Sequence, residues 1–266
     1  MININMIITA NWVIRDLGMQ IYNRQPNDMN ITISQSPIDK EIVDIYYYFA
    51  FENFKRKTNK LDVGFFTHPN NNEFRIIGKK LDHCIVMAKQ YESMLLSSGI
   101  PKKNISLIYP GVSKDFRPKI KILNPVKMTT KERQKRKGKE LWDRVCSLPF
   151  VQAECSNGKY TKKELLDLFH SSDIILSTST LEGGPMCIIE GLSCGKPVIA
   201  RKNVGFVDDI NGILTYSNFE ELKNILESIY KDKLKIYNNV KDFTVENWTD
   251  NHYDLFRKLV GAKNEK

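Results

Sequence analysis

Short apolar runs alternate with segments of helical periodicity along the whole chain. In the first half, six apolar runs are typical of buried strands: residues 6–10, 31–33, 45–51, 61–67, 84–87 and 105–109. Apolar residues recur at helical spacing in three segments between them: residues 12–22, 74–80 and 88–98. Strands that alternate with helices form parallel sheets. The pattern therefore predicts a small doubly wound α/β sheet for this half.

The second half repeats this alternation. Its apolar runs predict further strands, at residues 119–123, 150–153, 173–176 and 197–200. Thr161 followed by Glu164 predicts a capping box at the start of a helix. Ser217 with Glu220 predicts a second one, and residues 248–260 form the last amphipathic helix. We therefore expect a second α/β unit of the same kind.

Candidate chemistry lies at the end of the strand predicted at residues 173–176. Gly183 and Gly184 follow this strand and allow positive φ and close backbone approach, so their N–H groups can face a ligand. Pro185 stands where a first helical residue belongs. A helix that begins there offers free N–H donors and a positive dipole end, which suit a diphosphate. The strand, loop, helix and next strand together make a βαβ unit.

Two carboxylates flank this loop. Glu182 lies just before the predicted helix, and Glu190 lies about one and a half turns into it. As single residues, they would be interpreted as a loop charge and a solvated helix face. Two carboxylates around Gly-Gly-Pro at a strand end favour a functional site instead. One carboxylate can face a sugar while the other takes ribose hydroxyls.

The run from Glu182 to Ala200 resembles the E-x7-E signature of family 4 retaining glycosyltransferases. The usual run E-G-x-x-x-x-x-x-E-A-x-A-x-G-x-P-V is matched with Gly191 and Ser193 in place of two alanines. The resemblance implies the GT-B architecture: two Rossmann-like domains with a nucleotide-sugar bound in the cleft between them. It places Glu182 at the sugar as the catalytic carboxylate and Glu190 on the donor ribose. Four further residues are then substrate-binding candidates: Gly183, Gly184, Pro185 and Met186.

The resemblance also suggests the domain organisation. Residues 93–101, 108–112 and 116–118 are similar to the family's passage between its two domains. We therefore expect an N-terminal, acceptor-side domain at residues 1–116. The nucleotide-sugar domain is expected at residues 117–266, with a C-terminal helix that crosses back. The family usually has a Gly-Gly loop after the first strand, whereas this chain has Thr-Ala-Asn-Trp at residues 9–12.

Basic residues before the central unit are candidates for the donor phosphates. Lys137 and the glycine after it match the family's K-G dipeptide, whose lysine is expected to hold the diphosphate. The family's partner arginine is not cleanly present, which leaves Lys127, Arg133 and Arg136 as candidates. His68 ends a predicted parallel strand and matches the family's histidine near the sugar hydroxyls, so it is a second catalytic candidate. The alternative for His68 is an ordinary turn residue before Pro69.

Composition narrows the class of protein. The chain has 266 residues with 41% apolar and 27% charged residues, as in ordinary globular proteins. Its five cysteines show no C-x-x-C spacing, so neither a disulfide framework nor a zinc site is predicted. No D-x-D motif is present, and we expect no cofactor and no metal requirement. The N-terminus lacks the basic region of a signal peptide, which favours a cytoplasmic location, with peripheral membrane association as an extension.

The net charge of +9 is concentrated in one segment. Residues 119–144 hold ten Lys or Arg and three acidic residues, a net charge of +7. Three interpretations compete: an anionic membrane surface with a glycan or lipid-linked glycan acceptor, DNA, or a solvated loop. We rank the membrane or glycan first, because Trp142 is the segment's one aromatic residue and base-stacking surfaces need several.

The sequence thus predicts a retaining glycosyltransferase, expected to be a hexosyltransferase, with a nucleotide-sugar as donor. The retaining outcome comes from the family resemblance. One alternative is a virus-type DNA base glycosyltransferase. Another is a non-catalytic GT-B relic that binds a nucleotide, which the presence of Glu182, Glu190 and Lys137 disfavours. Sugar phosphorylases and epimerases share the fold, and fold alone does not separate them.

Overall fold

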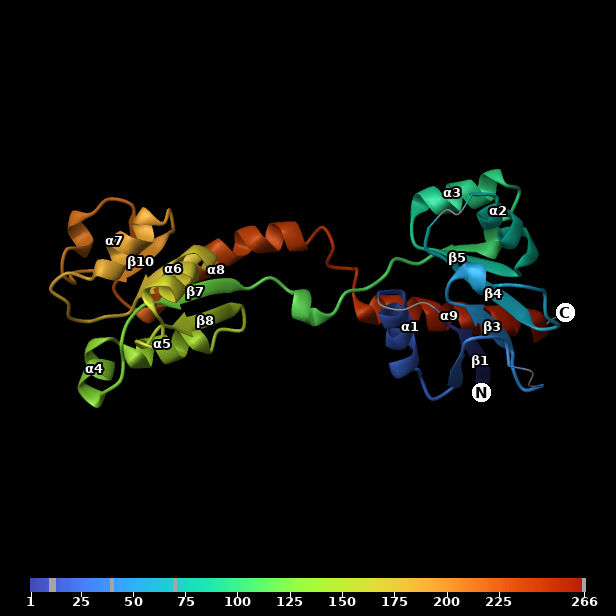
Figure 1. The fold of residues 1–266 in the computed structure, drawn as a ribbon, viewed down its shortest axis with the longest axis horizontal. Coiled ribbons are helices and arrows are strands. Elements are labelled where there is room, and N and C mark those ends of the chain that lie inside the picture. The colour runs from blue at the N-terminus through green and yellow to red at the C-terminus, as the bar shows by residue number, and fades with distance from the viewer. Residues whose placement is uncertain (10–12, 39–40, 69–70, 265–266) are drawn as a thin grey trace. The chain divides into compact units, whose positions relative to one another are not determined.

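The chain forms two compact α/β units in the computed structural model, which describes residues 1–9, 13–38, 41–68 and 71–264. The first unit consists of Met1–Phe116 with Lys241–Lys266, and the second consists of Arg117–Val240. Figure 1 shows a parallel sheet with helices packed on it in each unit. The predicted class, an α/β protein with two Rossmann-like units, is confirmed.

The first unit is built on a six-stranded sheet in its described residues, in the order β2-β1-β3-β4-β5-β6. Its strands are β1 (Ile2–Ile7), β2 (Met29–Ser34), β3 (Ile45–Tyr48), β4 (Leu61–Phe66), β5 (His83–Val86) and β6 (Ile105–Leu107). All neighbouring strands pair in parallel. The direction of winding reverses between β1 and β3, a position where open α/β sheets bind ligands beyond their carboxyl ends.

Helices cover both faces of this sheet. They are α1 (Val13–Asn23), α2 (Asn71–Lys80), α3 (Lys89–Ser97) and α9 (Val245–Asn264), with the 3-10 turns η1 (Phe51–Asn53), η2 (Lys102–Asn104) and η3 (Lys114–Phe116). One apolar core joins Leu17 of α1 and Trp248 of α9 to Tyr47 of β3. The other core joins Phe74 of α2 and Leu95 of α3 to the opposite face. Figure 1 shows α9 running beside the first sheet, although it is the last element of the chain.

The second unit has a five-stranded parallel sheet among its described residues, in the order β11-β10-β9-β7-β8. Its strands are β7 (Ile120–Asn124), β8 (Val151–Cys155), β9 (Ile174–Ser177), β10 (Val198–Arg201) and β11 (Ile213–Tyr216). Its helices are α4 (Lys131–Arg136), α5 (Lys139–Cys146), α6 (Lys162–Ser171), α7 (Met186–Ser193) and α8 (Phe219–Tyr237), with the 3-10 turn η4 (Val207–Asp209). The winding reverses between β7 and β9, so the predicted βαβ unit β9-α7-β10 begins at this switch point.

Three predicted boundaries are wrong for identifiable reasons. The first strand is Ile2–Ile7 and not residues 6–10. Ile4 and Met6 alternate with polar residues, so this strand does not form a continuous apolar run in the sequence. The strand predicted at residues 45–51 ends at Tyr48, and a 3-10 turn follows.

The third wrong boundary concerns the start of α8. The cap is Asn218 and not Ser217, and its side chain accepts from the Glu221 N–H at 3.0 Å. The capping box of Thr161 and Glu164 is confirmed. Residue 12, the predicted start of the first helix, lies outside the described residues.

A buried histidine gives the first unit a pH-dependent stability. His252 on α9 is fully buried, with Nδ1 2.8 Å from the Trp248 carbonyl oxygen and Nε2 2.9 Å from the Tyr47 hydroxyl. A carbonyl only accepts, so Nδ1 carries the proton and Nε2 accepts from Tyr47. Burial lowers the pKa of His252 to about 4. The folded unit therefore keeps this imidazole neutral well below neutral pH.

We expect stability to fall as the pH is lowered from about 6.5 to about 4. In this window the unfolded chain binds a proton at His252 that the folded chain does not bind, which costs up to about 3 kcal/mol. Urea unfolding of wild type and His252→Gln at pH 7.5 and 4.5 measures this cost. The variant should lose less stability on acidification. Some loss should remain, because burial also lowers the pKa of His83 to about 4. Equal losses in the two proteins would contradict the assignment.

Candidate functional site

A buried hydrogen-bond chain organises the switch point of the second sheet. Asn124 ends β7, and its Nδ2 donates to the Thr178 hydroxyl, 2.9 Å away just beyond β9. That hydroxyl donates in turn to the Lys137 carbonyl at 2.6 Å. Asn124 and Thr178 are fully buried. These hydrogen bonds therefore hold the turn at Lys137 over the carboxyl ends of β7 and β9.

The glycine of the K-G dipeptide is required by this packing. Gly138 has φ +68°, and a Cβ there would lie 2.1 Å from the Thr178 carbonyl oxygen. Thr180 adds two bonds to the same turn, because its N–H and its hydroxyl both donate to the Arg136 carbonyl, at 2.8 and 3.0 Å. Only glycine combines the left-handed φ with so close a backbone approach. The K-G dipeptide thus lies where this turn packs against the carboxyl end of β9.

A carboxylate between two cations lies beside this turn. The Lys137 ammonium forms an ion pair with Glu182. The Arg136 guanidinium lies 3.4 Å from the other Glu182 oxygen and 3.4 Å from the Leu181 carbonyl oxygen. The side chains of Glu182 and Lys137 are only 12% and 16% exposed, so water screens their attraction weakly. The structure therefore brings together Glu182 and Lys137, two of the residues singled out from the sequence.

The glycine loop between β9 and α7 takes its shape from a neighbouring loop. Neither Gly183 nor Gly184 has positive φ, so this part of the prediction is wrong. A Cβ on Gly184 would lie 2.8 Å from the Phe206 ring. The positive φ, +56°, is at Gly205, where a Cβ would lie 3.2 Å from the Glu182 carbonyl oxygen. The loop of residues 203–206 thus packs on the glycine loop and leaves no room for a side chain at position 184.

The start of α7 offers uncapped backbone donors. Pro185 is the N-cap with φ −72° and ψ 92°, and not the first helical residue as predicted. No side chain caps this end. Met186, the first helical residue, is 59% exposed. The positive end of the α7 dipole therefore lies at the carboxyl edge of the sheet, next to Glu182.

Glu190 lies further along α7 at the rim of an apolar groove. The groove lies between α6 and α7 and has a volume of about 310 Å³. Leu165, Phe169 and Ile189 supply apolar lining. Glu190 itself is exposed. Burial raises the pKa of the nearby Cys187 thiol to about 12, and the charge of Glu190 adds to this shift. Cys187 is therefore a protonated core residue at neutral pH.

Two other predicted phosphate ligands lie elsewhere in the second unit. Arg133 is on α4, where its guanidinium lies 3.5 Å from the Thr129 hydroxyl. Lys127 packs its side chain beside Gly158. In the described residues it is Arg136, the third candidate, that contacts Glu182. The contact that singles out Arg136 comes from the fold, because Thr180 bonds to the Arg136 carbonyl.

Part of the basic segment lines a separate groove of about 650 Å³. Lys131 and Lys135 of α4 face it together with Arg201 from the end of β10, and in the described part of the chain these three have no carboxylate partner. Arg144 also lines it and lies 3.7 Å over the Phe219 ring. The groove therefore presents uncompensated positive charge.

His68 belongs to the first unit, where it follows β4. Its Nε2 lies 3.1 Å from a Glu52 carboxylate oxygen, and its Nδ1 lies 2.8 Å from the Thr67 hydroxyl. The side chain is 55% exposed. Its predicted place near the sugar hydroxyls stays a prediction, and Pro69 lies outside the described residues.

The described residues contain neither a membrane-crossing helix nor a cluster of metal ligands. None of their helices has both the length and the apolar character that a membrane crossing requires. Across the same ranges, no group of three or more His, Cys, Asp or Glu side chains is placed to hold a metal ion.

Sequence comparison relates the second unit to a known family. Residues 151–244 match the model of the family described as glycosyl transferases group 1. This segment contains Glu182, the glycine loop and Glu190. The chain is also 26% identical to an uncharacterized glycosyltransferase of Methanocaldococcus jannaschii, in a match that covers 70% of this chain. The match spans 61% of the length of that relative.

Structural comparison finds similarity to several solved structures. HepE of Anabaena, crystallised with UDP-glucose, is 13% identical with a TM-score of 0.42, covering 97% of this chain and 100% of that one. Sucrose-phosphate synthase of Thermosynechococcus elongatus is 14% identical with a TM-score of 0.42, covering 98% and 100%.

Proposed function

We propose that this chain is a retaining glycosyltransferase that moves a hexose from a nucleotide-sugar to a glycan or lipid-linked glycan acceptor without a metal ion. The observation that carries the proposal is the cluster of Glu182, Lys137 and Arg136 at the carboxyl edge of the second sheet. It lies next to the uncapped start of α7, in a unit that matches glycosyl transferases group 1 over residues 151–244.

The donor diphosphate suits the cations of this cluster. Lys137 and Arg136 would turn from Glu182 to the phosphate oxygens, and the N–H groups at the start of α7 would add donors. Gly183 and Gly184 are exposed and leave their backbone accessible to the same group. Lys127 and Arg133 would contribute at longer range. Two cations and a helix end supply the positive charge that a metal supplies in other enzymes.

The nucleoside is proposed to lie along α7. Glu190 is exposed and accepts hydrogen bonds, which suits the two ribose hydroxyls. The adjoining groove of about 310 Å³ has an apolar lining, as expected of a surface that takes a base. Pro185 and Met186 lie between the diphosphate and the ribose in this arrangement.

We propose that the sugar binds beside the Glu182 carboxylate. In the reaction the bond from the anomeric carbon to the phosphate oxygen breaks, and the nucleoside diphosphate leaves with the electron pair. The acceptor hydroxyl oxygen bonds to the same carbon, and its proton passes to the departing diphosphate. Positive charge builds on the sugar ring, and the Glu182 carboxylate stabilises it once the phosphates have drawn Lys137 away. His68 is proposed to bind the sugar hydroxyls.

A donor screen tests the proposal. The full chain is heated with UDP-, GDP- and ADP-sugars in EDTA, and release of nucleoside diphosphate is measured with the stabilising donor. A donor at 100 times its dissociation constant should stabilise the chain by about 2.7 kcal/mol. The matching nucleoside monophosphate is the control and should stabilise it less. Stabilisation without turnover on any acceptor would indicate the non-catalytic relic. The absence of stabilisation by every donor would contradict the proposal.

The acceptor is proposed to be a glycan or a lipid-linked glycan at an anionic membrane, with the basic groove facing that surface. Liposome co-sedimentation and duplex-DNA binding, each across a salt series, separate this from the DNA alternative. Lys131→Gln/Lys135→Gln should reduce liposome binding, whereas Lys163→Gln/Lys231→Gln, with equal charge loss on exposed helices of the same unit, should not. A log–log salt slope of about −5 on DNA, as for six neutralised phosphates, without liposome binding would favour DNA. Binding to neither liposomes nor DNA would indicate that the basic segment is a solvated loop.

A further inference from the structure

Over β3, loops instead of a helix cover part of one face of the first sheet. Parallel strands are usually joined by a crossover α-helix. In the described residues, the connections from β2 to β3 and from β3 to β4 contain only loops and the 3-10 turn η1. Above Tyr46 and Tyr48 of β3 these loops leave a groove of about 520 Å³. Its volume lies within the usual range of small-molecule sites.

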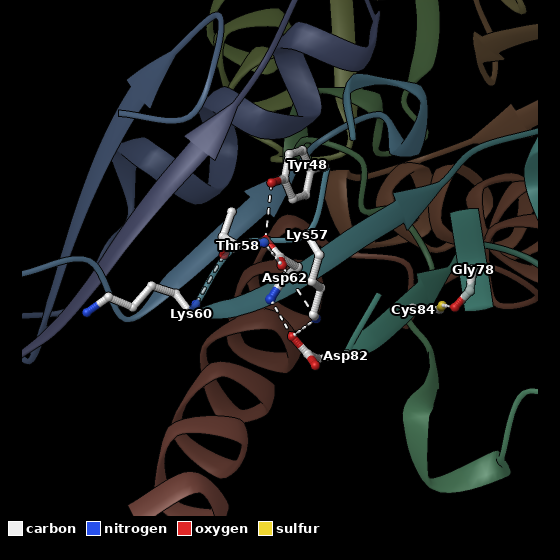
Figure 2. Close-up of polar contacts among 8 residues, drawn as sticks. All are labelled: Tyr48, Lys57, Thr58, Lys60, Asp62, Gly78, Asp82 and Cys84. Carbon is white, nitrogen blue, oxygen red and sulfur yellow. Dashed lines mark hydrogen bonds and ion pairs between the residues drawn. The ribbon is translucent and has the colours of Figure 1, made fainter. Parts of the chain in front are cut away.

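Two tyrosine side chains of β3, Tyr46 and Tyr48, form hydrogen bonds to the two walls of this groove. The Tyr46 hydroxyl donates to the Ile38 carbonyl at 2.7 Å and holds the first wall. The Tyr48 hydroxyl donates to Asp62 at 3.1 Å, and Asp62 accepts from the Thr58 N–H at 2.8 Å and the Thr58 hydroxyl at 3.0 Å. Figure 2 shows Tyr48, Thr58 and Lys57 converging on Asp62. The groove is thus shaped before any ligand enters.

Positive charge lines the groove, and none of the lining residues that the structure describes is a carboxylate. Lys55, Arg56 and Lys57 follow one another along the second wall. Lys57 is neutralised by Asp62, 3.4 Å away, and by Asp82. The Lys55 ammonium donates only to the Glu52 carbonyl oxygen, at 3.0 Å, within the described residues.

Arg56 is exposed and has no hydrogen bond or ion pair in the described part of the chain. Arg56 and Tyr48 both line the groove. Burial raises the pKa of Tyr48, and the charge of Arg56 opposes this shift. Within the described ranges, Lys55 and Arg56 therefore leave two charges without a carboxylate partner.

Asn53 lies in the 3-10 turn that follows the carboxyl end of β3, and its side chain carries a donor without an acceptor among the described residues. Its Oδ1 accepts from the Thr9 hydroxyl at 2.7 Å, so the other side-chain atom is Nδ2. Nδ2 is buried and has no acceptor among the described residues. Buried donors are normally paired. Asn53 also lines the groove, so a ligand bound there would change the surroundings of this amide.

We propose that this groove binds a sugar that carries a phosphate or carboxylate group, with Arg56 and Lys55 on the anionic group and Asn53 beside the ligand. Ser36, Thr58 and Asn59 also line the groove and supply neutral partners for sugar hydroxyls. The site belongs to the first unit and does not depend on the proposed transferase reaction.

The side-chain amide of Asn53 reports binding in this groove alone. The ¹⁵N-labelled full chain is titrated with glucose 6-phosphate, glucuronate, inorganic phosphate and glucose at constant ionic strength. The Asn53 NH₂ signal is assigned from its disappearance in Asn53→Leu. It should shift saturably with glucose 6-phosphate or glucuronate, and the stronger of the two identifies the anionic group. Glucose should cause no shift, and inorganic phosphate should bind more weakly.

A charge-matched pair of variants completes the test. Lys55→Gln/Arg56→Gln should weaken binding about tenfold or more, because two charge-assisted contacts are lost. Lys79→Gln/Lys103→Gln removes equal charge from exposed positions of the same unit and should leave the affinity unchanged. An unmoved Asn53 signal, an equal shift with glucose, or equal affinity in the two double variants would overturn the proposal.

Discussion

Glu182→Gln is expected to lower turnover about 100-fold or more while donor affinity changes little. The substitution keeps the shape of the side chain and removes the negative charge that faces the developing positive charge on the sugar. The effect should be large because Glu182 is only 12% exposed, so water does not replace the missing charge. Steady-state kinetics with the donor found in the screen separate kcat from KM, and the loss should appear in kcat.

Two further variants make this result specific. Glu190→Gln should chiefly raise the KM for the donor, because its proposed partner is the ribose. Glu227→Gln on α8 is the control, since its carboxylate pairs only loosely with Lys223 at 3.7 Å on the surface. Unchanged kinetics in both Glu182→Gln and Glu190→Gln would remove the proposed site. If His68→Ala keeps full turnover while Glu182→Gln loses it, His68 is a turn residue.

The central unit of the second domain was predictable because its signals are local. A parallel strand buried on both faces forms a continuous apolar run, and the run at residues 173–176 corresponds to β9 within one residue at each end. The capping box at Thr161 is also a signal within a few residues. The first strand was less visible, because Asn3 and Asn5 interrupt its apolar residues. Asn5 is buried because other residues satisfy its side chain: Nδ2 donates to the Ser34 hydroxyl of β2 at 2.9 Å, and Oδ1 accepts from the Ile38 N–H at 3.2 Å.

The choice among the basic residues required three-dimensional contacts. Ten Lys or Arg lie within residues 119–144, and their spacing does not distinguish Arg136 from Arg133. The distinction comes from the bonds of Thr180 to the Arg136 carbonyl, across a sequence separation of 44 residues. The groove of the first unit was hidden for the same reason. In the sequence, Lys55, Arg56 and Lys57 form a charged run typical of a solvated loop, and only the contacts to Asp62 place that run over β3.

Lys137→Met is expected to weaken binding of the nucleoside diphosphate about 10- to 100-fold, as for the loss of one charge-assisted hydrogen bond in a partly buried site. Methionine keeps most of the length of the side chain but cannot neutralise a phosphate. Arg136 would then remain as the nearest cation to Glu182 in the described residues, so turnover should fall as well. Calorimetric titration of the nucleoside diphosphate, with and without EDTA, measures the affinity directly.

The same titration tests whether the cations replace a metal. If Lys137 and Arg136 neutralise the departing diphosphate, wild-type affinity and turnover should be the same in EDTA as in Mg²⁺ or Mn²⁺. Lys131→Met removes an equal charge from an exposed position on α4 and should leave the affinity unchanged, because Lys131 lines the basic groove and not the Glu182 cluster. Equal losses in Lys131→Met and Lys137→Met would indicate a diffuse charge effect. A strict requirement for Mn²⁺ or Mg²⁺ would show that the two cations do not suffice, since the chemistry would then depend on a charge that the protein does not itself provide.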